Sequence, residues 1–320
     1  MMRRILSTCN FKPHCSALLI AVLLVGTTEI ILSSKIPAQY FSHEVDRTLH
    51  KIKTKPMKAD YILIGDSVGR QLLQRYGKDK RFAMLATNQA IEMTGQYFMV
   101  KRYLENNPPP KAVIFSGLPL FIDQNLEQRY TENYVLRTFN NFDESFELLI
   151  AKKNLVQAAK AVSYKLFPSF KYRLHLQKEI LGTTNASIYT GVRKKTGKNR
   201  SQNYSAGTIV KKLQSKYVSR YHLYKLTELL TTKGIHFYYI PVPIRNVKKV
   251  KNRYVRRYKT HFRLLSEWKN EGINITYFKH ITEYPNSMFR DSVHLNKEGL
   301  ANARPSFHTI IKKIVYNPNQ

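Results

Sequence analysis

The chain alternates short apolar runs with longer helical stretches from residue 59 onward, and this alternation constrains its fold more than any other feature. The apolar runs have the length of strands and are bounded by Gly, Asn or Pro. They span residues 60–65, 82–87, 111–117, 235–242 and 273–278. The helical stretches lie near residues 68–76, 93–106, 214–232, 248–270 and 297–315. Because strands that alternate with helices form a mainly parallel sheet with helices on both faces, the sequence predicts an α/β domain.

The first apolar run leads directly into Gly65, Asp66 and Ser67. In a parallel sheet, reactive groups gather at the carboxyl ends of the strands. A serine at the first turn of the next helix exposes its hydroxyl there, and its own backbone N–H can bind an oxyanion. The same tripeptide also suits a helix N-cap, since Asp and Ser are frequent capping residues. The tripeptide alone therefore leaves both interpretations of Ser67 open.

A second short sequence, near the other end of the chain, supplies the groups that a nucleophilic serine needs. Asp291 and His294 lie in one loop between the last predicted strand and the last predicted helix. Histidine is the usual base near neutral pH, and a neighbouring carboxylate fixes its tautomer and stabilises its charged form. The last helix is expected to pack on the sheet, because it carries apolar residues at helical spacing. These are Phe307, Ile310, Ile311 and Ile314.

Gly65-Asp66-Ser67 after the first strand, with Asp291-x-x-His294 before the last helix, resembles the SGNH (GDSL) hydrolase superfamily over residues 59–315. The resemblance implies a flavodoxin-like three-layer α/β/α sandwich. It also implies that Ser67 is the nucleophile of an acyl-enzyme reaction, with His294 as base and Asp291 as acid. The N-terminal apolar segment and the GDSVGRQLL sequence resemble the membrane-attached envelope members, which include proteins that act in alginate acetylation and teichoic acid D-alanylation.

The middle of the chain departs from the family pattern. Family members place a glycine after the second strand and Gly-x-Asn-Asp after the third, whereas here the third strand is followed by Gly117 and no asparagine. The candidate oxyanion donors are therefore the backbone N–H of Ser67, the side-chain amide of Asn88, and the backbone N–H of Ala90 or Gly95. A role for Asn88 as a plain turn residue stays equally open. One lost donor costs an efficient hydrolase about 3 to 4 kcal/mol.

Residues 16–34 form an apolar segment long enough to cross a bilayer, and Arg3, Arg4 and Lys12 precede it. Basic residues before such a span favour a cytoplasmic N-terminus. Residues 1–34 are therefore predicted to be a cytoplasmic stub and signal anchor, with one membrane span and the C-terminal domain on the extracytoplasmic side. A buried core helix and a cleaved signal peptide are the alternatives. A polar connector is predicted at 35–58, followed by a domain at 59–320.

The chain carries 53 Lys and Arg against 21 Asp and Glu, a net charge of +32. Such an excess implies an anionic partner, and a predicted amphipathic helix at residues 247–265 concentrates part of it. Acidic lipid headgroups and an anionic glycan or envelope polysaccharide fit equally well. No nucleic acid partner is expected, because the anchor would keep the domain out of the cytoplasm. A membrane-bound acyl-donor protein is a further candidate partner.

A segment at about residues 121–210 has no strand pattern and is predicted to be a helical insertion after the third strand. It is placed to act as a lid or substrate-shaping subdomain, or else it serves packing alone. The chain lacks the motifs of zinc, P-loop and dinucleotide sites, so no metal and no cofactor is expected. His222, His236 and His261 lie on apolar or basic stretches and are expected to be structural.

Taken with the resemblance, the motifs predict a membrane-anchored SGNH-like serine esterase or O-acyltransferase that acts on an envelope polysaccharide. An acetyl ester is the expected substrate. The same triad serves both reactions, since the acyl group passes either to water or to a sugar hydroxyl. An alternative keeps the fold without the chemistry, as a weakly active or inactive protein that binds glycan or assists polysaccharide assembly.

Overall fold

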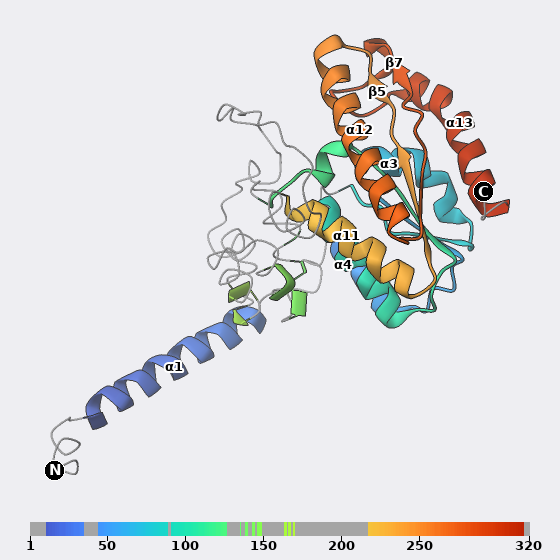
Figure 1. Cartoon of the computed structure of the whole chain (residues 1–320). Coiled ribbons are helices and arrows are strands. Elements are labelled where there is room, and N and C mark those ends of the chain that lie inside the picture. Colours follow the sequence, from blue (N-terminus) through green and yellow to red (C-terminus); the bar gives the residue numbers. More distant parts are fainter. Residues whose placement is uncertain are drawn as a thin grey trace.

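A parallel five-stranded sheet forms the centre of the protein (Figure 1). The computed structural model describes residues 11–34, 44–88, 91–126 and 217–316, with a few positions between 135 and 169. The strands are β1 (Tyr61–Gly65), β2 (Phe82–Met84), β3 (Ala112–Gly117), β4 (His236–Pro241) and β6 (Ile275–Tyr277). They pair in the order β2-β1-β3-β4-β6, and every pair is parallel. The predicted α/β class is confirmed, and each predicted apolar run contains one of these strands.

Helices cover both faces of this sheet (Figure 1). They are α3 (Ser67–Leu73) with the 3₁₀ helix η2 (Gln74–Lys78), α4 (Glu92–Asn106), α11 (Val218–Thr232), α12 (Lys248–Asn270) and α13 (Lys297–Tyr316). Helix α13 packs against α3, and α11 packs against α4. Right-handed crossovers between the parallel strands place α4, α11 and α12 on one face and α3 and α13 on the other. This arrangement is compatible with a three-layer sandwich.

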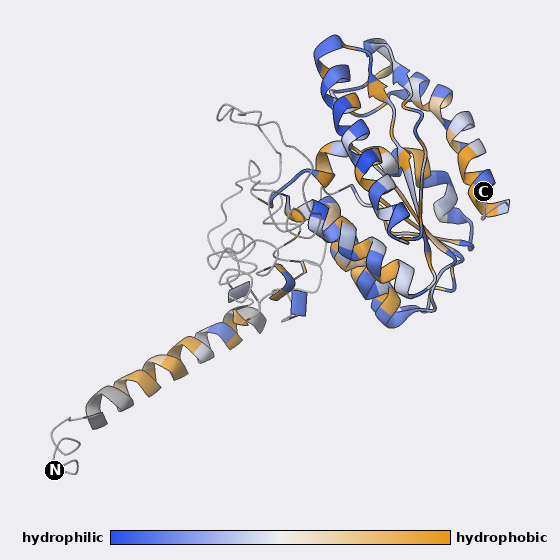
Figure 2. Cartoon of the chain, in the orientation of Figure 1, coloured by the Kyte–Doolittle hydropathy of each residue, from blue (hydrophilic) through white to orange (hydrophobic). Residues whose placement is uncertain are grey.

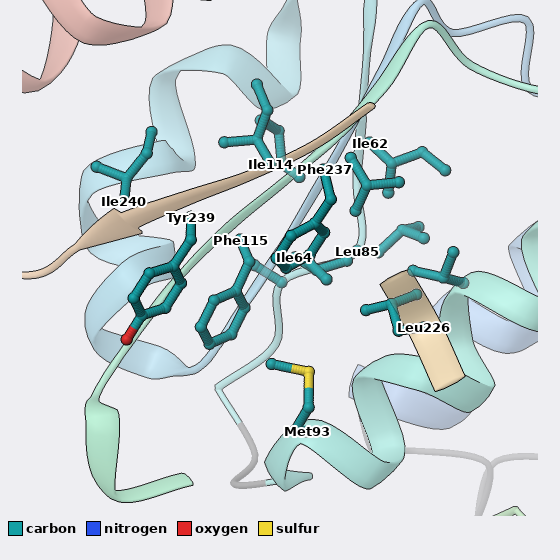
Figure 3. Close-up of a cluster of buried hydrophobic side chains, with 14 of the residues drawn as sticks. Ile62, Ile64, Leu85, Met93, Ile114, Phe115, Leu226, Phe237, Tyr239 and Ile240 are labelled. Carbon is teal, nitrogen blue, oxygen red and sulfur yellow. The ribbon is translucent and has the colours of Figure 1, made fainter. Parts of the chain in front are cut away.

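The core lies between the sheet and these helices. All five residues of β1 and all six of β3 are buried, as expected for a parallel sheet that is covered on both faces. Figure 3 shows Phe115 of β3 and Tyr239 of β4 beside Met93 of α4. The rings of Phe115 and Tyr239 stack with centroids 5.3 Å apart. This packing holds the carboxyl ends of β1 and β3 in place, and with them the residues that follow these strands.

The segment predicted as a polar connector contains a helix that packs on the domain. Helix α2 (Glu44–Thr54) contacts α4 and buries Val45 and Ile52. The side chain of Asn107 donates to the carbonyl of Ile52 (3.1 Å). The prediction for residues 35–58 is therefore corrected: α2 has apolar residues at helical spacing and belongs to the folded domain.

Helix α1 (Phe11–Ser34) coincides with the predicted anchor. Its large apolar side chains are exposed: Leu18, Leu19, Ile20, Val22, Leu23, Leu24, Val25, Ile30 and Ile31. Judged on the residues that the structure describes, no helix has the length and apolarity to cross a membrane. Most of the predicted insertion at 121–210 lies outside the described residues.

A second, two-stranded sheet extends the carboxyl edge of the main sheet, and the sequence did not predict it. Strand β5 (Ile244–Arg245) follows β4 and pairs in parallel with β7 (Glu283–Tyr284). The 3₁₀ helix η6 (Asn286–Met288) comes next and leads into the loop that carries Asp291 and His294. This small sheet therefore supports the predicted catalytic loop.

Candidate active site

The turn that carries Ser67 is built around the buried carboxylate of Asp66. One carboxylate oxygen accepts the backbone N–H groups of Val68 (2.9 Å) and Gly69 (3.0 Å), so Asp66 is the N-cap of α3. The other oxygen accepts the N–H of Leu118 (2.7 Å), which lies just beyond β3. The capping interpretation of this sequence is therefore correct for Asp66, and it leaves the hydroxyl of Ser67 uncommitted and partly exposed at the carboxyl edge of the sheet.

Two glycines let β3 approach this turn closely. A Cβ atom at Gly65 would lie 1.9 Å from the carbonyl oxygen of Ser116, and one at Gly69 would lie 1.8 Å from the same oxygen. Gly65 also has a φ of +154°, which disfavours other residues. Any side chain at either position would push the turn away from β3.

The buried amide of Gln96, on α4, holds the backbone just before the nucleophile. Its Nε2 donates to the carbonyl of Gly65 (2.9 Å), and its Oε1 accepts the Gly65 N–H (3.3 Å). Sequence reasoning missed Gln96, although a polar residue on the apolar face of a helix is a recognisable signal, because a buried amide needs partners.

The loop that carries the base is closed by its own backbone. The N–H of Arg290 donates to the carbonyl of His294 (2.8 Å), and Phe289 and Leu295 form an isolated antiparallel bridge. Both of these apolar side chains are buried, so they anchor the loop. Asp291 accepts the backbone N–H of His294 (2.8 Å), which sets the turn between the acid and the base.

Ser67, His294 and Asp291 are in hydrogen-bond contact. The Nε2 atom of His294 lies 2.8 Å from the hydroxyl oxygen of Ser67, and its Nδ1 lies 2.8 Å from Oδ2 of Asp291. Ser67 and His294, which are in contact through this Nε2 atom, are 227 positions apart in the chain. With Nδ1–H donating to the carboxylate, Nε2 is free to accept the serine proton. The geometry is that of a nucleophile, a base and a group that orients the base.

The two acids beside Ser67 sit in different environments. Burial raises the pKa of Asp66, although the backbone N–H groups of Gly69, Leu118 and Val68 oppose the rise. Burial also raises the pKa of Asp291, but hydrogen bonds from the backbone of His294 and Val293 and from the His294 ring outweigh it. The pKa of Asp291 is therefore below its ordinary value. An ionised Asp291 suits the stabilisation of a charged imidazole.

Only some of the predicted oxyanion donors have a backbone N–H that is free to bind an oxyanion. Asp66 takes the N–H groups of Val68 and Gly69, and no acceptor among the described residues takes that of Ser67. The N–H of Gly95 donates to the carbonyl of Ile91 (2.8 Å) at the start of α4, so Gly95 is corrected as a candidate: its donor is already used.

Two further candidates for the oxyanion hole follow β2. Asn88 is exposed, and its backbone N–H donates to a carboxylate oxygen of Glu44 (2.8 Å). A role for its side-chain amide stays a prediction. Ala90 lies outside the described residues. Among the predicted donors, the N–H of Ser67 is therefore the one that this geometry supports.

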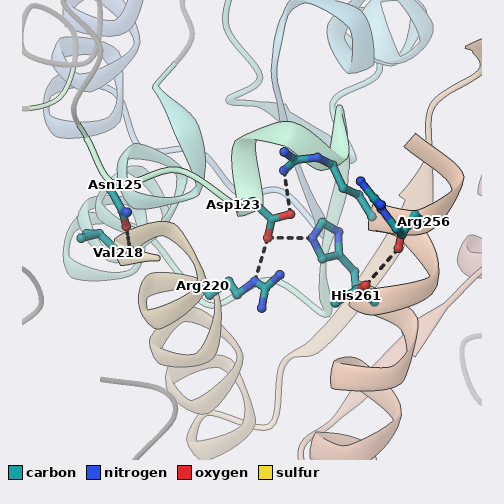
Figure 4. Close-up of polar contacts among 8 residues, drawn as sticks. Asp123, Asn125, Val218, Arg220, Arg256 and His261 are labelled. Atoms are coloured by element: carbon teal, nitrogen blue, oxygen red, sulfur yellow. Dashed lines mark hydrogen bonds and ion pairs between the residues drawn. The ribbon is translucent and has the colours of Figure 1, made fainter. Parts of the chain in front are cut away.

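A second polar cluster lies beyond β3 and was not predicted (Figure 4). Asp123 follows the 3₁₀ helix η3 (Pro119–Ile122), and its carboxylate accepts from Arg220 (2.7 Å), Arg257 (2.8 Å) and His261 (3.1 Å). Burial raises the pKa of Asp123, but its hydrogen bonds with His261 and Arg220 outweigh this and lower the pKa to about 2. The cluster ties α11 and α12 to the end of β3.

Within the described residues, no group of three or more His, Cys, Asp or Glu side chains is arranged to hold a metal ion. Comparison of the chain with protein-family models, curated proteins and solved structures finds no match to any of them. What the site does must therefore be inferred from its own geometry.

Proposed function

We propose that this protein is a membrane-anchored SGNH-like serine esterase or O-acyltransferase that acts on an envelope polysaccharide, with an acetyl ester as substrate. One observation carries the proposal: His294 contacts Ser67 through Nε2 and Asp291 through Nδ1, each at 2.8 Å. A nucleophile, a base and an orienting carboxylate in this order are what acyl transfer through a covalent intermediate requires.

In the first half-reaction, the Ser67 oxygen attacks the acyl carbon and His294 Nε2 takes the hydroxyl proton. Negative charge develops on the former carbonyl oxygen, and the N–H of Ser67 is placed to bind it. When the tetrahedral intermediate collapses, the alcohol of the substrate leaves with the proton from Nε2. The acyl group then remains on Ser67, and Asp291 has stabilised the transient imidazolium.

In the second half-reaction, water or a sugar hydroxyl attacks the acyl-enzyme. His294 Nε2 takes the proton of the attacking group and returns it to the Ser67 oxygen as the acyl group departs. Water yields hydrolysis, and a sugar hydroxyl yields transfer. The protein groups are the same in both cases, so access of the acceptor decides between them.

The fold and the N-terminal helix support the wider proposal. The strand order β2-β1-β3-β4-β6 corresponds to 2-1-3-4-5 in a flavodoxin-like sandwich, the architecture implied by the resemblance to SGNH hydrolases. The anchor is proposed from the apolar sequence of residues 16–34 and from the exposed apolar side chains of α1 between Leu18 and Ile31, although no described helix meets the length and apolarity of a membrane span. The net charge of +32 suits an anionic envelope polymer.

A second candidate function is glycan binding or assistance in polysaccharide assembly without efficient chemistry. It is favoured by the oxyanion hole, because Ser67 alone among the predicted donors within the described residues has a suitable backbone N–H. Loss of a donor slows an efficient hydrolase by roughly 10²- to 10³-fold. Measurable turnover that depends on the triad would distinguish the two functions.

The first test is release of acetate from p-nitrophenyl acetate by the full-length chain in a nonionic detergent. We expect the Ser67→Ala and His294→Ala variants to lose turnover by roughly 10³-fold or more, because each removes a member of the triad. Ser292→Ala, an exposed serine beside Asp291, is the matched control and should retain activity.

A second measurement covers the case of a transferase that ignores the model ester. A fluorophosphonate probe should label Ser67, identified by mass spectrometry of the digested protein, and His294→Ala should lower the rate of labelling. If the wild type neither turns over the ester nor labels at Ser67, the enzyme proposal fails and the glycan-binding function takes its place.

A further inference from the structure

The N-terminal half of α12 carries a dense row of cations, which we call the α12 ridge. Its members are Lys248, Lys249, Lys251, Arg253, Arg256, Arg257 and Lys259. Two of them are neutralised: Lys251 pairs with Glu283 (2.7 Å) and Arg257 pairs with Asp123 (2.8 Å). The other five make no ion pair with any carboxylate in the described part of the chain. Their side chains are exposed, so the ridge presents positive charge to the surroundings.

This arrangement is unfavourable for the isolated protein. Like charges three or four residues apart on a helix repel each other, as Lys249, Arg253 and Arg256 do here. Cations in the first turn of a helix also oppose the positive end of its dipole, and the first turn of α12 holds no acid. An anion that lies against the ridge would relieve both effects.

The ridge leads to the candidate active site. Helix α12 begins at the carboxyl edge of the sheet, since it follows β4 and β5. Lys251 pairs with Glu283 of β7, and the side chain of Arg245 contacts Asn286 of η6, immediately before the catalytic loop. On that loop, the side chain of Arg290 is 66% exposed and forms an ion pair with Asp291 (3.6 Å). The exposed cations of the ridge thus begin at the sheet edge that carries His294 and Ser67, whereas Lys251 and Arg290 are already paired with acids.

A membrane surface fits the ridge less well than a soluble polymer does. Helices that lie in a membrane interface insert an apolar face of Trp, Phe or Leu. The apolar face of α12 is already buried in the core, through Tyr254, Tyr258 and Phe262 among others. No large apolar side chain between 248 and 270 is exposed, and Figure 2 shows the hydrophilic colour of α12.

The ridge also has the extent of a short stretch of polymer. From residue 248 to residue 259 the helix rises about 17 Å. Cations spread over this length match charges that repeat along a chain better than they match one small anion.

We propose that the α12 ridge binds an anionic polysaccharide whose charged groups, carboxylate or phosphate, lie along the helix and direct a nearby ester to Ser67. This inference rests on the proposed function for the identity of the reaction, but binding itself does not require Ser67. It assigns the contact with an anionic polymer, which the net charge of the whole chain already favours, to one helix and to charges that repeat along the polymer.

The test is binding of fluorescein-labelled polygalacturonate to the full-length Ser67→Ala protein in a nonionic detergent, followed by fluorescence anisotropy. Labelled dextran serves as the neutral polymer. We expect polygalacturonate to bind more tightly than dextran, with an affinity that falls as salt is added. In the ridge variant K248Q/K249Q/R253Q/R256Q, we expect Kd to rise roughly 10- to 100-fold.

The matched control, K233Q/K269Q/K312Q/K313Q, removes the same charge at the opposite edge of the sheet, where α11, α12 and α13 end. It should change Kd by less than about threefold. Thermal unfolding of both variants establishes that they are folded. Equal weakening in both variants would mean that net charge alone attracts the polymer, and the ridge proposal would then be wrong.

Binding to vesicles that contain phosphatidylglycerol tests the remaining alternative, in which α12 contacts an acidic membrane surface. Ridge-dependent binding to these vesicles, without binding to polygalacturonate, would assign α12 to a membrane and overturn the proposal. The outcome is separable from that of the esterase test: a protein without turnover can still bind through the ridge, and an active esterase can bind without it.

Discussion

Two Asp-His pairs among the described residues have the same chemistry and different surroundings. In the first, Asp291 and His294 lie in a partly exposed loop, and the imidazole contacts Ser67 through its second nitrogen. In the second, Asp123 and His261 are buried, and the carboxylate is shared with Arg220 and Arg257. The Nδ1 atom of His261 is buried and has no partner among the described residues.

The difference indicates what the proposed role of His294 as a base depends on. Burial lowers the pKa of His261, an effect that the hydrogen bond to Asp123 only partly opposes, so this imidazole stays neutral. Its side chain is fully buried, and among the residues that the structure describes no serine hydroxyl contacts it. His294 instead has a nucleophile on one nitrogen and an ionised acid on the other, at an edge that a substrate can approach. Position at the sheet edge, rather than the pairing itself, is what the chemistry needs.

The largest effect expected is on turnover, from a matched pair of substitutions. Asp291→Asn should lower kcat/KM for p-nitrophenyl acetate by roughly 10²- to 10⁴-fold, because the imidazole loses the carboxylate that fixes its tautomer and stabilises its charge. Asp123→Asn should lower it by less than about tenfold. Steady-state kinetics of both variants measures the two changes in kcat/KM. Equal losses would mean that the two pairs do not differ in role.

The next largest effect is on stability, and here Asp123→Asn should have a larger effect than Asp291→Asn. Asp123→Asn should lower the free energy of unfolding by about 3 kcal/mol, because it removes the carboxylate from a buried cluster with two arginines. Both guanidinium groups reach solvent in part, which keeps the loss at the low end of that class. Urea unfolding at pH 7 measures the change.

Two controls belong to the stability measurement. Asp291→Asn should change the free energy of unfolding much less, since that carboxylate is 44% exposed. Asp79→Asn, in an exposed ion pair with Arg81, should have little or no effect. A loss for Asp291→Asn as large as that for Asp123→Asn would contradict the comparison.

The smallest effect is on the pH dependence of stability. The pKa of Asp123 is about 2 in the folded protein and near its ordinary value when unfolded, so its stabilisation is complete above about pH 4. It is lost as the pH falls from about 4 through 2, because the unfolded state binds the proton first. The wild-type free energy of unfolding should fall in this window by on the order of 2 kcal/mol more than that of Asp123→Asn. Parallel urea titrations at pH 5 and 2.5 test this.

The sheet could be predicted from sequence because each strand is a continuous apolar run. Residues 61–65, for example, are apolar up to Gly65 and buried throughout. Strands β5 and β7 could not, because two residues each carry no pattern. Helix α2 was missed since its apolar positions are few and its mean hydropathy is low.

The contact among Ser67, His294 and Asp291 could be predicted for a different reason: Ser67 follows a strand of the parallel sheet, and Asp291 and His294 lie in the loop before the last helix, at the same edge. Gly95 was wrongly chosen because glycine suggests an available backbone, whereas helix α4 has already begun and uses its N–H. The cluster at Asp123 was missed because its members, from residue 123 to residue 261, come from three separate segments. Neither the spacing nor the composition of the chain brings such residues together.

The separation of 227 positions between Ser67 and His294 has a consequence for when the site can form. A chain that leaves the ribosome from its N-terminus exposes the nucleophile early, and its base arrives only with the last segment. Until α13 packs against α3 and closes the loop over Ser67, the nascent protein holds an unactivated serine. The proposed acyl transfer would therefore begin only when the C-terminal segment has folded.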